Sequence, residues 1–207
     1  MAYVGQTRGR WLTARLMAAG IGECTVRGEL PPRRVPFFYD NGAFGDWKAQ
    51  RPFDAVAFRE DLASLRKHRL VPDFVVAPDV VAGGESSLVE SLRWLDECRS
   101  VGPVYLAVQD GMGLETVRAS VDGFAGLFVG GTLEWKLSTG QSWCRLAHEL
   151  GLACHVGRVG SARRIRWAQR IGADSIDSAL PLWSDSHMRR FLSALRHEQG
   201  DLFAEVA

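Results

Sequence analysis

The stretch VYLAVQDGMGLETVRASVDGFAGLFVGG, residues 104–131, contains the pattern that decides the fold. Two short apolar runs, at 104–110 and 126–131, flank a helix-like segment at 113–120. Both runs are hydrophobic almost without interruption, which is typical of parallel strands that are covered on both faces. A strand, a helix and a second strand in this order predict one βαβ unit of a parallel sheet.

The same alternation extends along the chain in both directions. Eight strands in 207 residues fit the lower end of the size range of (β/α)8 barrels, so we expect one small TIM-type barrel domain over residues 1–207. The segment 24–40 is too short to hold a helix between two strands, so we expect an irregular barrel there. An open doubly wound sheet is the alternative. The predicted strands are 2–5, 24–27, 36–40, 73–79, 104–110, 126–131, 152–157 and 175–179, and the predicted helices are 9–19, 53–68, 87–99, 113–120, 139–150, 162–171 and 186–198.

Composition sets broad limits on the class of protein. Hydrophobic residues make up 46% and charged residues 24% of the chain, which is typical of a globular protein. No apolar run approaches the roughly 20 residues of a membrane-spanning helix, and residues 1–10 lack a signal-peptide core. We therefore expect no membrane partner and a cytoplasmic location, which is the host cytoplasm if a phage encodes the protein. The formal net charge of +1 does not by itself indicate nucleic-acid binding.

The four cysteines, Cys24, Cys98, Cys144 and Cys154, are widely spaced and form no CxxC pair. This spacing argues against a zinc ribbon and against a disulfide scaffold. We expect reduced thiols, no metal site and no cofactor.

Polar residues and glycines follow the predicted strands. In a parallel barrel the carboxyl ends of all strands meet at one mouth, where the active site lies. Carboxylates crowded around such a mouth are expected to have perturbed pKa values and acid/base roles. Each residue also has a purely structural interpretation, such as a turn or a buried core histidine. These residues are Asp40, Asp79, Gln109, Asp110, Gly130, Gly131, His155, Gly157, Arg158 and Asp177.

Two details refine this set. Asp174 and Asp177 are three residues apart, so only one of them can face the mouth, and Asp177 lies deeper in its strand. The segment 157–162, GRVGSA, joins a late strand to a helix that Ser161 is expected to cap, and such a loop can bind a phosphate. Arg163, Arg166 and Arg170 are spaced to form the solvated face of that helix.

The order of these motifs resembles the tRNA-guanine transglycosylase superfamily, whose members exchange guanine for a 7-deazaguanine on a (β/α)8 barrel. The resemblance covers residues 37–181. Its motifs are DNGAF at 40–44, Asp79, VQDG at 108–111, VGG at 129–131, GRVG at 157–160 and GADSIDSALP at 172–181.

The resemblance implies a pentosyltransferase that exchanges bases by double displacement. Asp177 would be the nucleophile and Asp40 the acid/base. Asp79 would read the base edge, while Gln109 and the Gly130 and Gly131 amides would contact the base carbonyl. Three further residues are expected in the base pocket, namely Asp110, His155 and Gly157.

The chain departs from the tRNA enzymes of this family in features that bear on whether the substrate is DNA or tRNA. Nothing matches the Cys-x-Cys-x-x-Cys…His zinc site of the tRNA enzymes, and only 30 residues follow Asp177. The chain is similar to the compact, zinc-free transglycosylases of phages and bacterial DNA-modification clusters, which also favour a segment like GTLEWK at 131–136. This favours DNA over tRNA as the partner, with a 7-deazaguanine such as preQ0 or preQ1 as the incoming base. A tRNA-directed enzyme remains an alternative.

Basic residues near the expected mouth are candidates for backbone contacts, namely Arg158, Lys136, Arg33 and Arg34. Tyr39, Phe44 or Trp183 would stack on the base or pack in the core. The sequence leaves open a protein partner or a homodimer, with Tyr3, Trp11 and Phe191 either at a subunit contact or in the core.

Two rival functions remain. A sugar-phosphate isomerase or aldolase would explain the loop at 157–161, but Lys48, Lys67 and Lys136 all fall in helices or loops rather than at a strand end. A non-catalytic relative is the second rival, and the presence of both expected catalytic aspartates counts against it.

Overall fold

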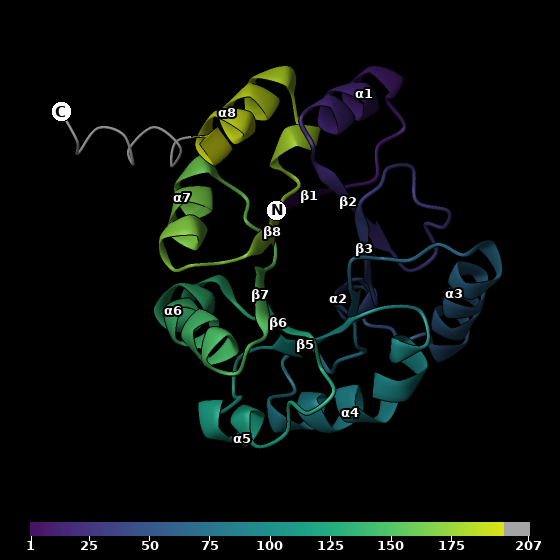
Figure 1. Cartoon of the computed structure of the whole chain (residues 1–207), viewed down its shortest axis with the longest axis vertical. Helices are drawn as coiled ribbons and strands as arrows, with labels where there is room; N and C mark the ends of the chain where they lie inside the picture. Colours follow the sequence, from purple (N-terminus) through teal and green to yellow (C-terminus); the bar gives the residue numbers. More distant parts are fainter. Residues whose placement is uncertain (197–207) are drawn as a thin grey trace.

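The computed structural model describes residues 1–196 and has a closed barrel of eight parallel strands. Figure 1 shows the helices on the outside of this ring of strands. The (β/α)8 barrel expected from the sequence is therefore confirmed. The strands are β1 (Ala2–Gly5), β2 (Gly22–Val26), β3 (Phe37–Asp40), β4 (Val75–Val76), β5 (Val104–Val108), β6 (Gly126–Val129), β7 (Ala153–Val156) and β8 (Ser175–Asp177).

The helices follow their strands in the expected alternation, except that no helix joins β2 to β3 and that two helices follow β3. They are α1 (Arg10–Ala18), α2 (Ala43–Lys48), α3 (Ala55–His68), α4 (Glu85–Arg99), α5 (Leu114–Arg118), α6 (Leu133–Glu149), α7 (Ala162–Arg170) and α8 (Asp185–Arg196), with a short 3-10 helix at Leu180–Leu182. No helix within residues 1–196 is both long and apolar enough to span a bilayer.

The barrel closes where the first strand pairs with the last. β1 lies parallel to β8, with Tyr3 opposite Asp177, and β1 also pairs with β2, with Gly5 opposite Cys24. In turn, β2 pairs with β3, with Val26 opposite Asp40. Because every pair is parallel, all the strand ends that carry the candidate residues open on the same face of the barrel.

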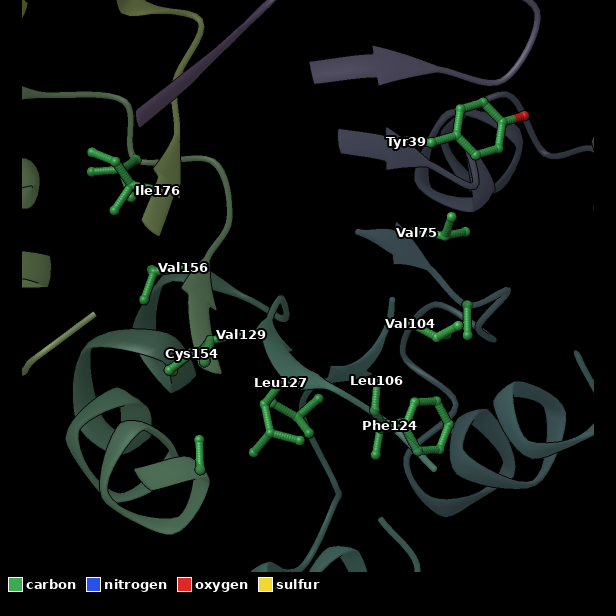
Figure 2. Close-up of a cluster of buried hydrophobic side chains, with 14 of the residues drawn as sticks. Tyr39, Val75, Val104, Leu106, Phe124, Leu127, Val129, Cys154, Val156 and Ile176 are labelled. Atoms are coloured by element: carbon green, nitrogen blue, oxygen red, sulfur yellow. The ribbon is translucent and has the colours of Figure 1, made fainter. Parts of the chain in front are cut away.

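Two separate apolar layers stabilise the barrel. The space between strands and helices holds the larger cluster, with outward-pointing Tyr39, Val75, Leu106 and Leu127 (Figure 2). The barrel interior is filled by aromatic side chains, as Phe38 stacks on Phe74 at 4.6 Å and Tyr3 meets Phe38 edge-on at 5.0 Å. The interior below the mouth is therefore a packed floor rather than a channel.

The expected irregularity between β2 and β3 is also confirmed, because no helix joins these strands. A buried ion pair lies beside them, with Arg34 Nη1 3.3 Å from Glu23 Oε2 and both side chains fully excluded from solvent. Arg34 Nη2 also donates to the carbonyls of Val4 and Gly5. The β2–β3 loop therefore contributes a buried cation that is paired with a carboxylate of β2, although Glu23 Oε2, Arg34 Nη1 and Arg34 Nε have no hydrogen-bond partner within residues 1–196.

Three elements differ from the sequence-based prediction. α2 was not predicted, because its six residues contain too few turns to show an apolar period. α6 begins at Leu133 rather than at residue 139, because Thr132 caps it by accepting a hydrogen bond from the Trp135 amide. β4 is reduced to two residues. Residues 197 and 198 of the last predicted helix lie outside the described residues.

The aromatic residues considered for a subunit contact are also placed. Tyr3 and Phe191 are buried within this chain, so their side chains belong to its core. Trp11 on α1 is 61% exposed, with the Arg15 guanidinium 4.5 Å from its ring centroid.

Candidate active site

A cavity of about 700 Å³ lies at the carboxyl ends of the strands and brings most of the candidate residues together. Val76, Ala107 and Phe128 from the barrel interior form part of its apolar wall. The candidate residues that line it are Asp40, Asp79, Gln109, Asp110, Gly130, Gly131, Lys136, Arg158 and Asp177.

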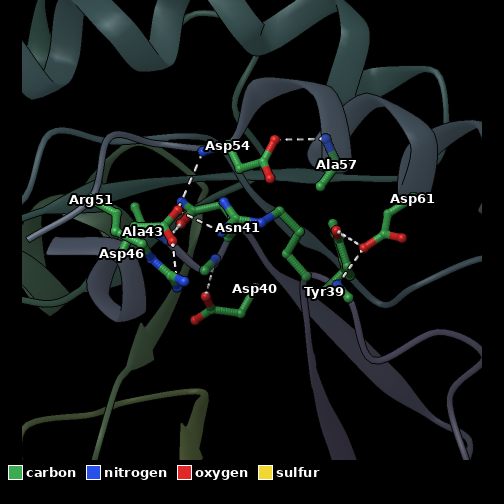
Figure 3. A network of polar contacts seen from close by, with 12 residues as sticks. Tyr39, Asp40, Asn41, Ala43, Asp46, Arg51, Asp54, Ala57 and Asp61 are labelled. Carbon is green, nitrogen blue, oxygen red and sulfur yellow. Dashed lines mark hydrogen bonds and ion pairs between the residues drawn. The ribbon is translucent and has the colours of Figure 1, made fainter. Parts of the chain in front are cut away.

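Asp40 ends β3 and begins the turn that leads to α2. Its Oδ1 accepts a hydrogen bond from the Gly42 amide at 2.7 Å, and Gly42 has a positive φ of 77° that suits glycine (Figure 3). Burial raises the pKa of Asp40 to about 6, with the nearby Asp177 and Asp79 charges adding to the rise and the Gly42 bond opposing it. Asp40 can therefore hold or release a proton near neutral pH.

Asp177 ends β8 and is held through one carboxylate oxygen. Oδ1 accepts from His155 Nε2 at 3.0 Å and from the Arg158 amide at 3.1 Å. No hydrogen bond to Oδ2 is formed within residues 1–196, so this oxygen is free to react. As expected, the neighbouring Asp174 lies elsewhere, where it accepts from the Cys154 amide and contacts His148.

His155 lies beneath Asp177, fully buried, rather than in the cavity lining. Burial lowers its pKa, so the ring is neutral, and its Nδ1 lies 2.8 Å from Ser175 Oγ. Because a carboxylate only accepts, Nε2 carries the hydrogen and Nδ1 accepts from the serine. The expectation that His155 binds a base is therefore wrong: it orients Asp177.

Asp79, from the loop after β4, faces the cavity together with two amide side chains. Its Oδ1 accepts from Asn41 Nδ2 at 2.9 Å, and its Oδ2 accepts from Gln109 Nε2 at 3.1 Å. Burial raises the pKa of Asp79, and these two hydrogen bonds oppose that rise. Gln109 Nε2 also contacts Val80 O and Ser87 Oγ, so donation to a ligand requires it to exchange one of these acceptors.

The glycine pair after β6 offers one free backbone donor. The Gly130 amide donates to Val108 O at 2.9 Å, which corrects its expected role as a donor to a base. The Gly131 amide has no partner within the described residues, and its φ of 69° suits glycine. Asp110 also lines the cavity, and each of its two oxygens accepts a hydrogen bond from Thr132 at 2.7 Å. Asp110 therefore fixes the loop that presents Gly131.

α2 forms an aromatic part of the cavity rim. Phe44 and Trp47 line the cavity, and their rings stack at 5.8 Å. The helix is anchored by the buried Asp46, which accepts from Arg27 at 2.5 Å and from Arg51 at 3.3 Å (Figure 3). Trp47 was not predicted as a site residue, because a tryptophan in an unpredicted helix carries no signal of its own.

Three cationic side chains also line the cavity. Lys136 in the first turn of α6 is only 4% exposed and donates from Nζ to Gly157 O. Arg158 donates from Nη2 to Gly131 O at 2.8 Å and lies over the Phe44 ring at 4.2 Å. Arg164, in the first turn of α7, lines the cavity but was not predicted as a site residue, whereas Arg163, Arg166 and Arg170 form the exposed stripe of that helix.

Several other expected contacts do not form. Arg34 is buried against Glu23, so its expected role as a nucleic-acid contact is wrong. Arg33 lies at a separate, smaller hollow with Gln6 and Glu29. Gly157 contributes its carbonyl to Lys136 and packs on Phe128 rather than lining the cavity.

Two of the candidate stacking residues also lie away from the cavity. Tyr39 points outward and donates to Asp61 at 2.8 Å (Figure 3). Trp183 is 64% exposed and meets His187 edge-on.

No group of three or more histidine, cysteine, aspartate or glutamate side chains suited to a metal occurs within residues 1–196. Comparison of the sequence with protein-family models and with curated proteins gives no match. The case for a function therefore depends on the geometry and chemistry of the cavity.

Proposed function

We propose that this protein exchanges a guanine base in nucleic acid for a 7-deazaguanine such as preQ0 or preQ1, through a covalent glycosyl-aspartate. One observation carries the proposal: a single cavity is lined by two carboxylates of different character, Asp40 and Asp177, and by a base-sized set of polar groups. Retaining exchange at a sugar carbon needs such a pair, one as nucleophile and one as acid/base.

In the first step Asp177 Oδ2 attacks C1′ of the target nucleotide. The bond from C1′ to guanine N9 breaks, and the base leaves with the electron pair while Asp40 gives it a proton. The pKa of about 6 suits Asp40 to this role because a useful fraction of the side chain is protonated near neutral pH. His155 and the Arg158 amide hold Oδ1, which directs Oδ2 at the sugar.

In the second step the incoming base replaces the first. Asp40, now a carboxylate, removes the proton from N9 of the 7-deazaguanine, and N9 attacks C1′. The bond between C1′ and Asp177 breaks, and its electron pair returns to the carboxylate. Protons and electrons balance over the two steps, so no cofactor is required for the exchange.

The remaining polar groups match the hydrogen-bonding edge of guanine. Asp79 accepts from the N1 and N2 donors of the base, and the Gly131 amide donates to O6. Gln109 keeps Asp79 in place and turns one N–H to O6 when the base enters. A base within a duplex cannot reach this cavity, so the target nucleotide is flipped out or single-stranded. DNA is the proposed nucleic acid, on the resemblance to compact zinc-free transglycosylases.

The test is base exchange with labelled guanine on duplex DNA, single-stranded DNA and bulk tRNA, comparing wild type with Asp177→Ala. We expect label to enter DNA and the variant to lose at least about a thousandfold in rate, since it lacks the nucleophile. Asp174→Asn is the matched control, because Asp174 immediately precedes the same strand and does not line the cavity. Exchange by Asp177→Ala near the wild-type rate would contradict the mechanism, and label in tRNA alone would overturn the choice of DNA.

A second candidate function gains support from Lys136. Although Lys136 does not stand at a strand end, its side chain reaches the cavity from α6, and burial lowers its pKa to about 8. A lysine of this kind forms imines with carbonyl compounds, as aldolases require. Borohydride trapping of a sugar phosphate on Lys136, together with no base exchange, would favour this function.

A further inference from the structure

Three positive charges line one side of the cavity without a carboxylate bound to any of them. Within residues 1–196, neither Lys136, Arg158 nor Arg164 forms an ion pair, although eleven such pairs occur elsewhere in that range. The three side chains come from separate elements, the first turn of α6, the β7–α7 loop and the first turn of α7. Their convergence on one cavity therefore requires tertiary structure and is not a local charge run.

Lys136 is the most informative of the three. The residue is 4% exposed, and within residues 1–196 its ammonium group has one hydrogen-bond acceptor, the Gly157 carbonyl, for its three donors. Its pKa is lowered to about 8, mainly by burial and also by the charges of Arg158 and Arg164, while the charges of Asp177 and Asp110 oppose this shift. A buried, underbonded cation beside two other cations is unfavourable in an empty cavity, and an anion would relieve both the desolvation and the repulsion.

The backbone around the three side chains also suits an anion. Thr132 and Ser161 cap α6 and α7, so the positive ends of both helices point to this part of the cavity. Arg158 has a left-handed φ of 57°, which is strained for a residue with a side chain. In that conformation its amide reaches Asp177 Oδ1 while its guanidinium reaches Gly131 O.

We propose that Lys136, Arg158 and Arg164 form a subsite for a phosphate ester of the substrate. On the proposed function, on which this identity rests, the ligand is a phosphodiester next to the target nucleotide in single-stranded DNA. Because Arg158 also bonds Asp177, the subsite lies beside the carboxylate that attacks the sugar. Binding a phosphodiester there fixes the position of C1′, whereas the polar groups around Asp79 fix the base.

The test compares two adjacent arginines of α7. Arg164 lines the cavity, and Arg163 is exposed and does not, so Arg164→Gln and Arg163→Gln remove the same charge at neighbouring positions. Binding of a fluorescent single-stranded oligonucleotide with one guanine is measured over a range of salt concentrations. We expect about tenfold weaker binding for Arg164→Gln and a salt slope reduced by about 0.7, with Arg163→Gln close to wild type. Equal effects of the two substitutions would overturn the subsite.

A second arm locates the phosphate and separates its two sources. An oligonucleotide with a neutral methylphosphonate beside the guanine should bind wild type more weakly than its natural counterpart does. The corresponding loss should be smaller in Arg164→Gln, since the contact of Arg164 with this phosphate is already absent there. Additive losses would overturn the proposal. Inorganic phosphate and glycerol 3-phosphate are tested as competitors. Glycerol 3-phosphate could bind in a way that depends on Arg164, while the methylphosphonate has no effect on oligonucleotide binding. This result would support the subsite, but its ligand would then be a small phosphate monoester and not a phosphodiester.

These results are independent of base exchange. Base exchange with normal phosphate binding by Arg164→Gln would overturn the subsite and leave the proposed function intact. Loss of phosphate binding in Arg164→Gln, in a protein that exchanges no base, would support the subsite and reject the proposed function. Thermal unfolding of each variant, expected within a few degrees of wild type, shows that lost binding is not lost folding.

Discussion

Two groups of charges on the same barrel differ in whether they have an ion-pair partner. Between β2 and β3, Glu23 and Arg34 are fully buried, paired at 3.3 Å and supplied with carbonyl acceptors from β1. Around the cavity, Asp40 and Lys136 are desolvated without an ion-pair partner within the described residues, and their pKa values move toward neutrality. The first group takes the place of a missing helix, and the second lines a cavity large enough for a nucleobase.

The difference gives a criterion for separating structural from functional charges. Removing one partner of a buried ion pair is strongly destabilising, because the other charge is left buried and uncompensated. A buried charge without a partner is destabilising while it is present, and natural proteins retain such groups mainly at functional sites. Substitutions in the two groups should therefore change stability in opposite directions.

The largest effect is expected at the paired group. Arg34→Met leaves the Glu23 carboxylate buried without its cation, so the free energy of unfolding should fall by about 3 to 5 kcal/mol. Chemical denaturation followed by circular dichroism measures this change. Arg33→Met, one residue earlier and at the rim of a surface hollow, is the control and should stay within about 0.5 kcal/mol of wild type. A small effect of Arg34→Met would show that the pair is not structural.

A smaller effect of opposite sign is expected at Asp40. Its pKa is about 6 in the folded protein against 3.8 for the ordinary group, so the folded state binds the proton more tightly and stability falls as the pH rises through this window. Asp40→Asn removes this penalty while its side-chain oxygen can still accept from the Gly42 amide. We expect a gain of about 1 to 3 kcal/mol at neutral pH and almost none at about pH 4. Destabilisation at neutral pH would contradict the assignment of Asp40 as an unpartnered buried acid.

The smallest effect is expected below the cavity. Ser175→Ala removes the hydroxyl that donates to His155 Nδ1, which should lower stability by about 0.5 to 1.5 kcal/mol. If Ser175 and His155 position Asp177, Ser175→Ala should slow the first exchange step even at temperatures where the variant is fully folded. Ser175→Thr should restore the rate of this step. Equal rates for the alanine and wild-type proteins would show that His155 has only a packing role on Phe128.

Most of the fold could be predicted from the chain because its strands are short, apolar and separated by helices. The apolar runs at 104–110 and 126–131, with a helix-like segment between them, indicate a parallel α/β sheet, and the short 24–40 segment indicates the helix-free connection. α2 and the early start of α6 could not be predicted. The contacts of Asp46 anchor α2 and the Thr132 side chain caps α6, and neither contact produces an apolar period in the sequence.

The sequence predicts the candidate residues at the strand ends, but it does not predict their hydrogen-bond partners or the residues that other elements add to the cavity. Asp40, Asp79 and Asp177 stand at the ends of strands, where topology alone brings them together. Hydrogen-bond partners depend on three-dimensional contacts, so the sequence did not show that the Gly130 amide is already bonded or that His155 lies below the cavity. Arg164 was missed for the same reason, since one arginine among several on α7 has no distinguishing spacing.

Cys24 lies in the wall of the cavity, whereas the other three cysteines are buried and do not line it. Burial, together with the charges of Asp40 and Asp177, raises the pKa of its thiol well above the ordinary value. The group therefore keeps its hydrogen at neutral pH and is a native vibrational probe. The S–H stretching band of Cys24 responds to the local electric field, so its shift on adding a base or a nucleotide would report occupancy without an introduced label.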